Sequence, residues 1–207
     1  MKILYTGLDP KRYRFTGELV HYPVIETVPI NELDEATQQV WPKITHVLFT
    51  SPTAVKHWLV LAPSLEEKEV LAIGAGTASF FSKALIAPFA TQEGMIALLE
   101  TLDLRDAFLL WPHSVQARPL LSEYLRKNSM AFHSVALYQT VVRNPGPLPD
   151  FDEIVFTSPS TVAAFLHLHG HIPWEKKVTA IGPITQKALE NVAKGHCSAR
   201  GVFADER

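Results

Sequence analysis

The chain has 207 residues, of which 47% are hydrophobic and 19% charged, the composition of an ordinary soluble globular protein. Its formal net charge of −2 gives no overall basic field that would favour nucleic acid or an anionic membrane as a partner. The single Cys197 excludes an intrachain disulfide, no apolar run approaches the roughly 20 residues of a membrane span, and the first apolar run is too short for a signal peptide. We therefore expect a cytoplasmic monomer with no membrane or nucleic-acid partner.

Short apolar runs alternate with helical patterns along the chain. Apolar, β-rich runs of strand length predict strands at residues 2–6, 24–30, 46–50, 69–73, 88–91, 107–111, 132–142, 153–157, 177–181 and 198–202. Helical spacing and capping residues predict a helix directly after the strand at 153–157 and further helices at 11–20, 51–61, 77–85, 94–102, 115–126 and 185–192. Such alternation is typical of βαβ units and parallel sheets.

Two short sequences occur twice. Phe-Thr-Ser-Pro stands at 49–52 and again at 156–159, and Ala-Ile-Gly stands at 72–74 and again at 180–182. The interval between the two sequences is nearly the same in both copies. This pattern indicates that one supersecondary unit was used twice, an arrangement that usually builds two lobes around a shared cleft.

The clearest linker is Asn-Pro-Gly-Pro-Leu-Pro at 144–149, because three prolines in six residues cannot join the interior of a sheet or helix. If the chain also crosses between domains just after Pro29, the N-terminal strands belong with the second repeat. We predict an α/β fold of two parallel-sheet lobes joined by two extended linkers. The predicted lobes are residues 1–29 with 147–207, and 33–140, and the predicted linkers are 30–32 and 141–146.

Hydroxyl side chains and glycines stand where the predicted strands end and the helices begin. Ligands of open α/β sheets bind beyond the carboxyl ends of the strands, and a helix N-terminus favours an anion. Each hydroxyl taken alone could simply cap its own helix, but the pattern kept by both copies favours carboxylate or phosphate binding. The candidates are Thr50, Ser51, Gly74, Thr77, Thr157, Ser158, Ser160, Gly182 and Thr185.

Motifs for other chemistries are missing. There is no Gly-x-Gly-x-x-Gly after the first strand, no P-loop and no Gly-x-Ser-x-Gly, so we expect neither a cofactor nor a hydrolase triad. His167, His169 and His171 suggest a metal tract, but a solvated helix end explains them better, and we predict no metal. Tyr138 lies on the strand that leads into the proline-rich linker. Its phenol could donate a proton to a departing oxygen, or its ring could simply be buried.

These sequences, in this order, resemble the uroporphyrinogen-III synthase family. The resemblance rests on Phe-Thr-Ser-Pro-Ser-Thr-Val at 156–162, Ala-Ile-Gly-Pro-Ile-Thr at 180–185, Leu-Tyr-Gln-Thr at 137–140 and Phe-Thr-Ser-Pro at 49–52. It implies two α/β lobes with the active site between them. It also implies a cofactor-free cyclising lyase of haem biosynthesis, which removes water from the linear tetrapyrrole hydroxymethylbilane and closes it to uroporphyrinogen III with the last pyrrole ring inverted.

The resemblance also assigns roles to residues. Tyr138 is the candidate proton donor to the departing hydroxyl, and Ser158, Ser160 and Thr185 are candidates for holding the polycarboxylate substrate. Thr6, Thr161 and Arg118 match family positions and join the candidate substrate-binding residues. The alternative is a two-lobed protein without enzymatic activity that senses or carries a small polycarboxylate and closes on it by a hinge motion.

Overall fold

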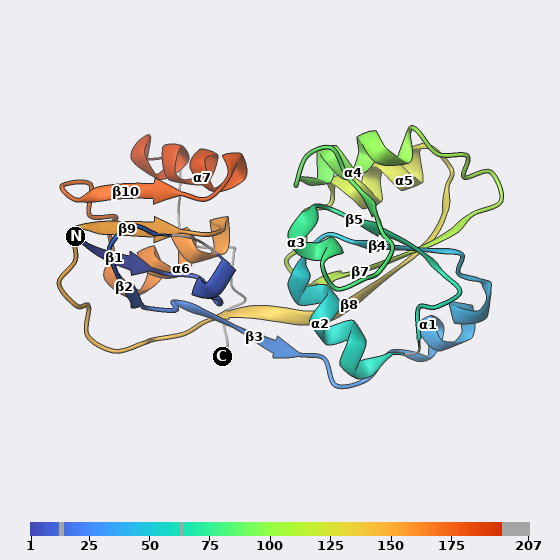
Figure 1. Cartoon of the computed structure of the whole chain (residues 1–207), viewed down its shortest axis with the longest axis horizontal. Coiled ribbons are helices and arrows are strands. Elements are labelled where there is room, and N and C mark those ends of the chain that lie inside the picture. Colours follow the sequence, from blue (N-terminus) through green and yellow to red (C-terminus); the bar gives the residue numbers. More distant parts are fainter. Residues whose placement is uncertain (13–14, 63, 196–207) are drawn as a thin grey trace. The chain divides into compact units, whose positions relative to one another are not determined.

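The computed structural model describes residues 1–12, 15–62 and 64–195. The chain divides into two compact units, Met1–Thr27 with Thr140–Arg207, and Val28–Gln139 (Figure 1). The first unit is discontinuous, so the chain passes between the units twice. These crossings lie a few residues before the linkers predicted at 30–32 and 141–146.

The first unit is built on a four-stranded sheet in the order β10-β9-β1-β2, and its three strand pairs are parallel. The strands are β1 (Lys2–Tyr5), β2 (Glu18–His21), β9 (Glu153–Phe156) and β10 (Lys177–Ala180). The helices that follow β9 and β10 are α6 (Pro159–His169) and α7 (Pro183–Ala193). Two segments from opposite ends of the chain therefore form one sheet, with β1 between β2 and β9.

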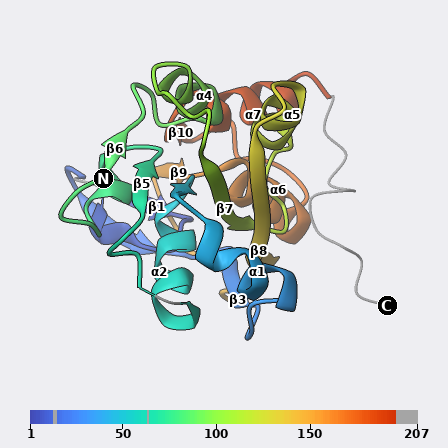
Figure 2. The same cartoon turned by 90° about the vertical axis from the view of Figure 1, so that its right-hand side faces the viewer.

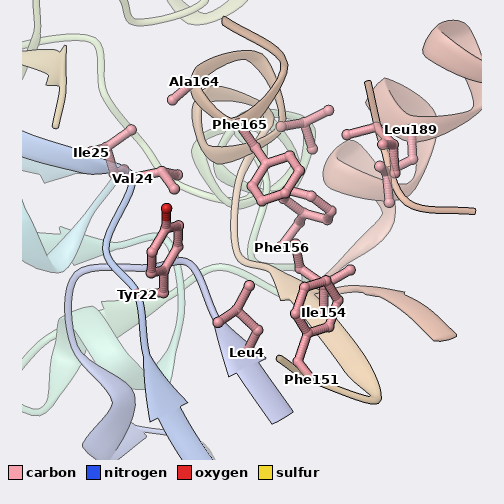
Figure 3. Close-up of a cluster of buried hydrophobic side chains, with 12 residues drawn as sticks. Leu4, Tyr22, Val24, Ile25, Phe151, Ile154, Phe156, Ala164, Phe165 and Leu189 are labelled. Carbon is pink, nitrogen blue, oxygen red and sulfur yellow. The ribbon is translucent and has the colours of Figure 1, made fainter. Parts of the chain in front are cut away.

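Buried side chains from both helices and the sheet form the core of this unit (Figure 3). Phe156 of β9 meets Phe165 of α6 edge to face, with ring centroids 5.5 Å apart. Leu4 and Leu189 are buried in the same cluster. Burial of a Phe or Leu side chain stabilises a fold by roughly 1.5–3 kcal/mol, so this cluster fixes α6, and the loop before it, against the sheet.

The larger sheet, most of which belongs to the second unit, has the order β3-β8-β7-β4-β5-β6. Its strands are β3 (Ile25–Pro29), β4 (His46–Phe49), β5 (Glu69–Ala72), β6 (Leu85–Ile86), β7 (Phe108–Ser114) and β8 (Ala131–Val142). The pairs from β8 to β6 are parallel. The helices are α1 (Glu35–Val40), α2 (Pro52–Leu61), α3 (Ala75–Ala78), α4 (Gln92–Leu99) and α5 (Leu120–Lys127).

Both faces of this sheet are covered, with α1 and α2 on one side and α4 and α5 on the other (Figure 2). Successive residues of a strand point to opposite faces, and the core follows that rule. Val47 and Phe49 of β4 pack in one cluster with Trp58 of α2. Leu48 between them packs in another cluster with Met95 of α4 and Leu121 of α5. This two-sided burial explains the continuous apolar run at 46–50.

The repeated Ser-Pro pair starts a helix in both units, as predicted. Ser51 and Ser158 are the N-cap residues of α2 and α6, and a proline follows each at the first helical position. Both serine side chains accept a hydrogen bond from a backbone N–H in the first turn. A proline fits there because that position needs no N–H partner.

Three predicted elements are wrong, and β2, α1 and a 3-10 turn at Trp41–Lys43 were missed. The described residues of the segment 11–20 contain no α-helix: a 3-10 turn covers Pro10–Arg12, and strand β2 begins at Glu18. Gly17, with a φ of +143°, and the bond from Glu18 N–H to the Met1 carbonyl start that strand. The helix predicted at 77–85 is only the short α3, and the strand expected at 88–91 is β6 instead. α1, capped by Asp34, was not predicted, and the strand predicted at 198–202 lies outside the described residues.

Candidate active site

Tyr138 lies at the carboxyl edge of the sheet in the second unit. Its side chain is buried, with 7% of its surface exposed, and its hydroxyl is 3.0 Å from the Ser51 hydroxyl. Burial raises the pKa of the Tyr138 phenol above its ordinary value, whereas hydrogen bonds from Ser51 and Ser114 oppose the rise. The phenol is therefore protonated at neutral pH, in the state a proton donor needs.

A bulge in β8, in which Leu137 is the extra residue, brings Ser114 of β7 opposite Tyr138. The two strands pair in regular register up to His113 and Ala136, and then the register shifts so that Ser114 pairs with Tyr138 and Leu137 is passed over. Bulges of this kind re-aim side chains and are common next to active sites. Ser114 was not among the predicted site residues, because the strand was expected to end at Trp111 and instead continues to Ser114.

His57 of α2 covers one face of the Tyr138 ring. The two rings are stacked, with centroids 5.0 Å apart and an interplanar angle of 21°. Burial lowers the pKa of His57, so its imidazole is neutral near pH 7. No pattern in the sequence indicates this contact, because His57 lies in the middle of the helix predicted at 51–61 and belongs to no motif.

Thr50, directly after β4, is fixed by an aromatic neighbour. The Trp111 indole N–H donates to the Thr50 hydroxyl over 3.1 Å. The Trp111 and His113 rings lie 4.4 Å apart between centroids, and burial lowers the pKa of His113. Thr50, Ser51, Ser114 and Tyr138 thus form a polar group at one edge of the sheet, bordered by neutral aromatic rings.

In the first unit the predicted hydroxyls gather after β1 and β9. The Ser158 and Ser160 hydroxyls are 2.8 Å apart at the start of α6, and neither residue is fully buried. Thr157 packs against Gly7, where a Cβ atom would lie 2.5 Å from the threonine methyl group. A side chain at position 7 would therefore displace Thr157.

Four predicted threonines are buried and turned inward. Thr6 donates to the Val155 carbonyl over 2.9 Å. Thr161 has no exposed surface; its hydroxyl donates to the Ser158 carbonyl and accepts from the backbone N–H groups of Thr157 and Ser158. Thr77 and Thr185 are each 2% exposed. In this structure, these side chains support the loops at the strand ends.

The remaining candidate site residues are two glycines at helix starts and one paired arginine. Gly74 and Gly182 are the N-cap residues of α3 and α7, and Gly182 has a φ of +85°, which strongly favours glycine. Arg118 forms a bidentate salt bridge with Glu93, with distances of 2.9 and 3.0 Å. The hydrogen bond from Arg118 lowers the pKa of Glu93 to about 2, and the Glu93 carboxylate balances the positive charge of Arg118.

Among the residues that the structure describes, no three histidine, cysteine, aspartate or glutamate side chains are grouped to hold a metal ion. His169 instead packs on Phe165 and Tyr22, and α6 ends at Gly170 in the left-handed conformation. None of the helices in the described part of the chain has the length and apolarity of a membrane span.

The sequence model of uroporphyrinogen-III synthase, HemD, matches residues 10–199. The chain belongs to the uroporphyrinogen-III synthase family. This assignment favours the interpretation of the chain as a synthase over the alternative of a carrier or sensor protein. A comparison with curated proteins found no match.

Solved structures of this family share the fold. A mutant uroporphyrinogen III synthase from Thermus thermophilus is 18% identical, with a TM-score of 0.58 over 93% of this chain and 89% of the other. Uroporphyrinogen-III synthetase from Helicobacter pylori is 16% identical, with a TM-score of 0.58 over 94% of this chain and 89% of the other. The parallel α/β architecture is therefore that of the family.

Proposed function

We propose that this chain converts hydroxymethylbilane to uroporphyrinogen III, with Tyr138 as the proton donor. The family match over residues 10–199 is the observation that carries the reaction. In that reaction the linear tetrapyrrole loses water and closes with its last ring inverted. Because the bilane closes by itself to the uninverted isomer, the enzyme must hold the chain so that the substituted carbon of the last ring attacks.

The surroundings of Tyr138 support its role. A group that protonates a departing hydroxyl must be protonated at working pH and fixed in place. Burial keeps the phenol protonated, and Ser51, Ser114 and His57 hold it. The surrounding rings exclude water, which would compete with the substrate for the phenol proton.

The hydroxyls of the first unit are proposed to bind substrate carboxylates. Ser158 and Ser160 lie at the N-terminus of α6, an 11-residue helix whose dipole favours an anion there. Gly182, at the start of α7, is proposed to offer backbone N–H groups in the same way. We assign Thr50, Thr157 and Gly74 to lesser substrate contacts, and Thr6, Thr77, Thr161 and Thr185 to supporting the loops that make them.

Arg118 is proposed to bind a substrate carboxylate only if it leaves Glu93, because both terminal nitrogens of its guanidinium already donate to the Glu93 carboxylate. The substrate is a small linear tetrapyrrole, and no cofactor is assigned a step. A monomeric state and a cytoplasmic location stay predictions.

Substitution of Tyr138 by Phe tests the proposal. It removes the hydroxyl and keeps the ring, so formation of uroporphyrinogen III from hydroxymethylbilane should slow by roughly ten- to ten-thousand-fold. Tyr124→Phe is the matched control, since Tyr124 lies on α5 and its hydroxyl interacts with Glu100 and not with the polar group around Tyr138. An unchanged rate in Tyr138→Phe would show that another group donates the proton.

A further inference from the structure

Ser114 of β7 lies opposite Tyr138 only because β8 carries one extra residue, Leu137, at that point. Without the register shift after His113, the residue opposite Ser114 would be Leu137. The shift is fixed by the backbone, since Val115 N–H donates to the Tyr138 carbonyl over 2.9 Å. A bulge disturbs the pairing of two strands, and bulges are common next to active sites. A bulge that brings two hydroxyl groups together at the edge of a sheet therefore suggests a functional role.

We infer that Ser114 is a positioning residue for the reaction, which acts with Ser51 as a donor to the Tyr138 oxygen after that oxygen has lost its proton. This inference rests on the proposed role of Tyr138. Ser51 already accepts the Ala54 backbone N–H over 3.0 Å, and its own hydroxyl proton is free to point toward Tyr138. Ser114 supplies the second donor.

The proton balance shows why two donors are needed. Tyr138 gives its proton to the hydroxymethyl oxygen, the C–O bond breaks with its electron pair on oxygen, and water leaves. The substrate is then a cation and Tyr138 a phenolate. The substituted pyrrole carbon that attacks carries no hydrogen, so its older bond to the bridging carbon breaks, and that bridge rejoins the last ring at its unsubstituted carbon. The phenolate takes back the proton that this unsubstituted carbon then loses. Between these two steps the negative charge sits on a buried oxygen, where an unsatisfied charge is costly.

A phenolate has no proton to donate, so its hydrogen bonds depend on donors around it. In the described structure the hydrogen-bonding neighbours of the Tyr138 oxygen are the hydroxyls of Ser51 and Ser114, and both can donate to it. Hydrogen bonds to a charged group stabilise it more than hydrogen bonds to a neutral one. Ser114 therefore makes Tyr138 a stronger acid than its burial alone would allow.

The test compares Ser114→Ala, which removes the donor, with Ser114→Thr, which keeps a hydroxyl and suits a strand. We expect Ser114→Ala to lower kcat by about ten- to a hundredfold with KM unchanged, the size of a hydrogen bond to a charged group. Ser114→Thr should keep most of the activity. Ser122→Ala is the matched control, since that buried serine donates to the Pro119 carbonyl on α5.

A second readout does not depend on turnover. Fluorotyrosine incorporated into each variant is titrated by fluorine NMR, and the Tyr138 resonance is assigned as the one that Tyr138→Phe removes. Ser114→Ala should raise the Tyr138 pKa, whereas Ser114→Thr and Ser122→Ala should leave it in place.

Unchanged kcat in Ser114→Ala would overturn the inference, and so would a loss of kcat with no shift of the Tyr138 pKa, which would mark a merely structural role. If wild-type protein forms no uroporphyrinogen III, the proposed function fails and the catalytic role of Ser114 fails with it. If wild type is active, Tyr138→Phe is slowed and Ser114→Ala behaves as wild type, the inference alone fails.

Discussion

The imidazole of His57 lies nearly parallel to the phenol of Tyr138, with ring centroids 5.0 Å apart. His57 belongs to α2, the helix that Ser51 caps, so one helix supplies both a ring on the face of Tyr138 and a hydroxyl at its oxygen. The orientation of the phenol is therefore tied to the packing of α2 on the sheet.

Replacement of His57 by Ala should loosen Tyr138. An aromatic pair is worth about 0.5–1.5 kcal/mol beyond its buried area, so we expect kcat to fall about two- to tenfold. His57→Phe keeps a stacked ring and should retain activity. His171→Ala, at an exposed site in the other unit, is the control. Equal losses in His57→Ala and His57→Phe would indicate that the imidazole nitrogens, not the ring face, matter.

Thr161 should matter for stability and not for substrate affinity. Its hydroxyl completes a capping box at the start of α6 and has no exposed surface. Thr161→Ala should lower the free energy of unfolding of the first unit by about 1–2 kcal/mol, measured by hydrogen exchange of the α6 amides. Thr161→Ser keeps the hydroxyl and should restore it. A higher KM without loss of protection would instead place Thr161 among the substrate contacts.

The Glu93–Arg118 pair should stabilise the fold only above acid pH. The pKa of Glu93 is lowered to about 2 from 4.5, chiefly by its hydrogen bond with Arg118. Its stabilisation is therefore complete above pH 4.5 and is lost as the pH falls toward 2. Both side chains are about half exposed, so Glu93→Gln should cost at most about 1 kcal/mol at pH 7 and clearly less near pH 2, where much of the Glu93 carboxyl is protonated. Urea denaturation at the two pH values checks this, and an equal cost at both would contradict it.

The fold could be predicted from the sequence where local signals agreed. Ser51-Pro52 and Ser158-Pro159 carry both an N-cap and a first-turn proline, and each starts a helix. The helix predicted at 11–20 was wrong because strand pairing overrides the local pattern there. Residues 18–21 pair with β1 in the sheet, and a local helical pattern cannot show such a contact.

Individual site residues were harder to predict than the edge on which they lie. Thr50, Ser51 and Tyr138 do come together, because the carboxyl ends of parallel strands share one edge. The sequence could not predict which hydroxyl groups face inward. Ser158 and Thr161 are close in sequence, yet only Thr161 is fully buried. The contact between Ser114 and Tyr138 depends on a bulge that leaves no mark in the residue pattern.

As a synthase, this chain should direct ring closure to the inverted isomer. The most direct measurement gives hydroxymethylbilane to increasing concentrations of the protein and separates the two uroporphyrinogen isomers after oxidation. The fraction of isomer III should rise with protein concentration until it exceeds the spontaneous isomer, and Tyr138→Phe should require far more protein to do so. If only the spontaneous isomer forms at every concentration, the protein is not a uroporphyrinogen-III synthase in activity.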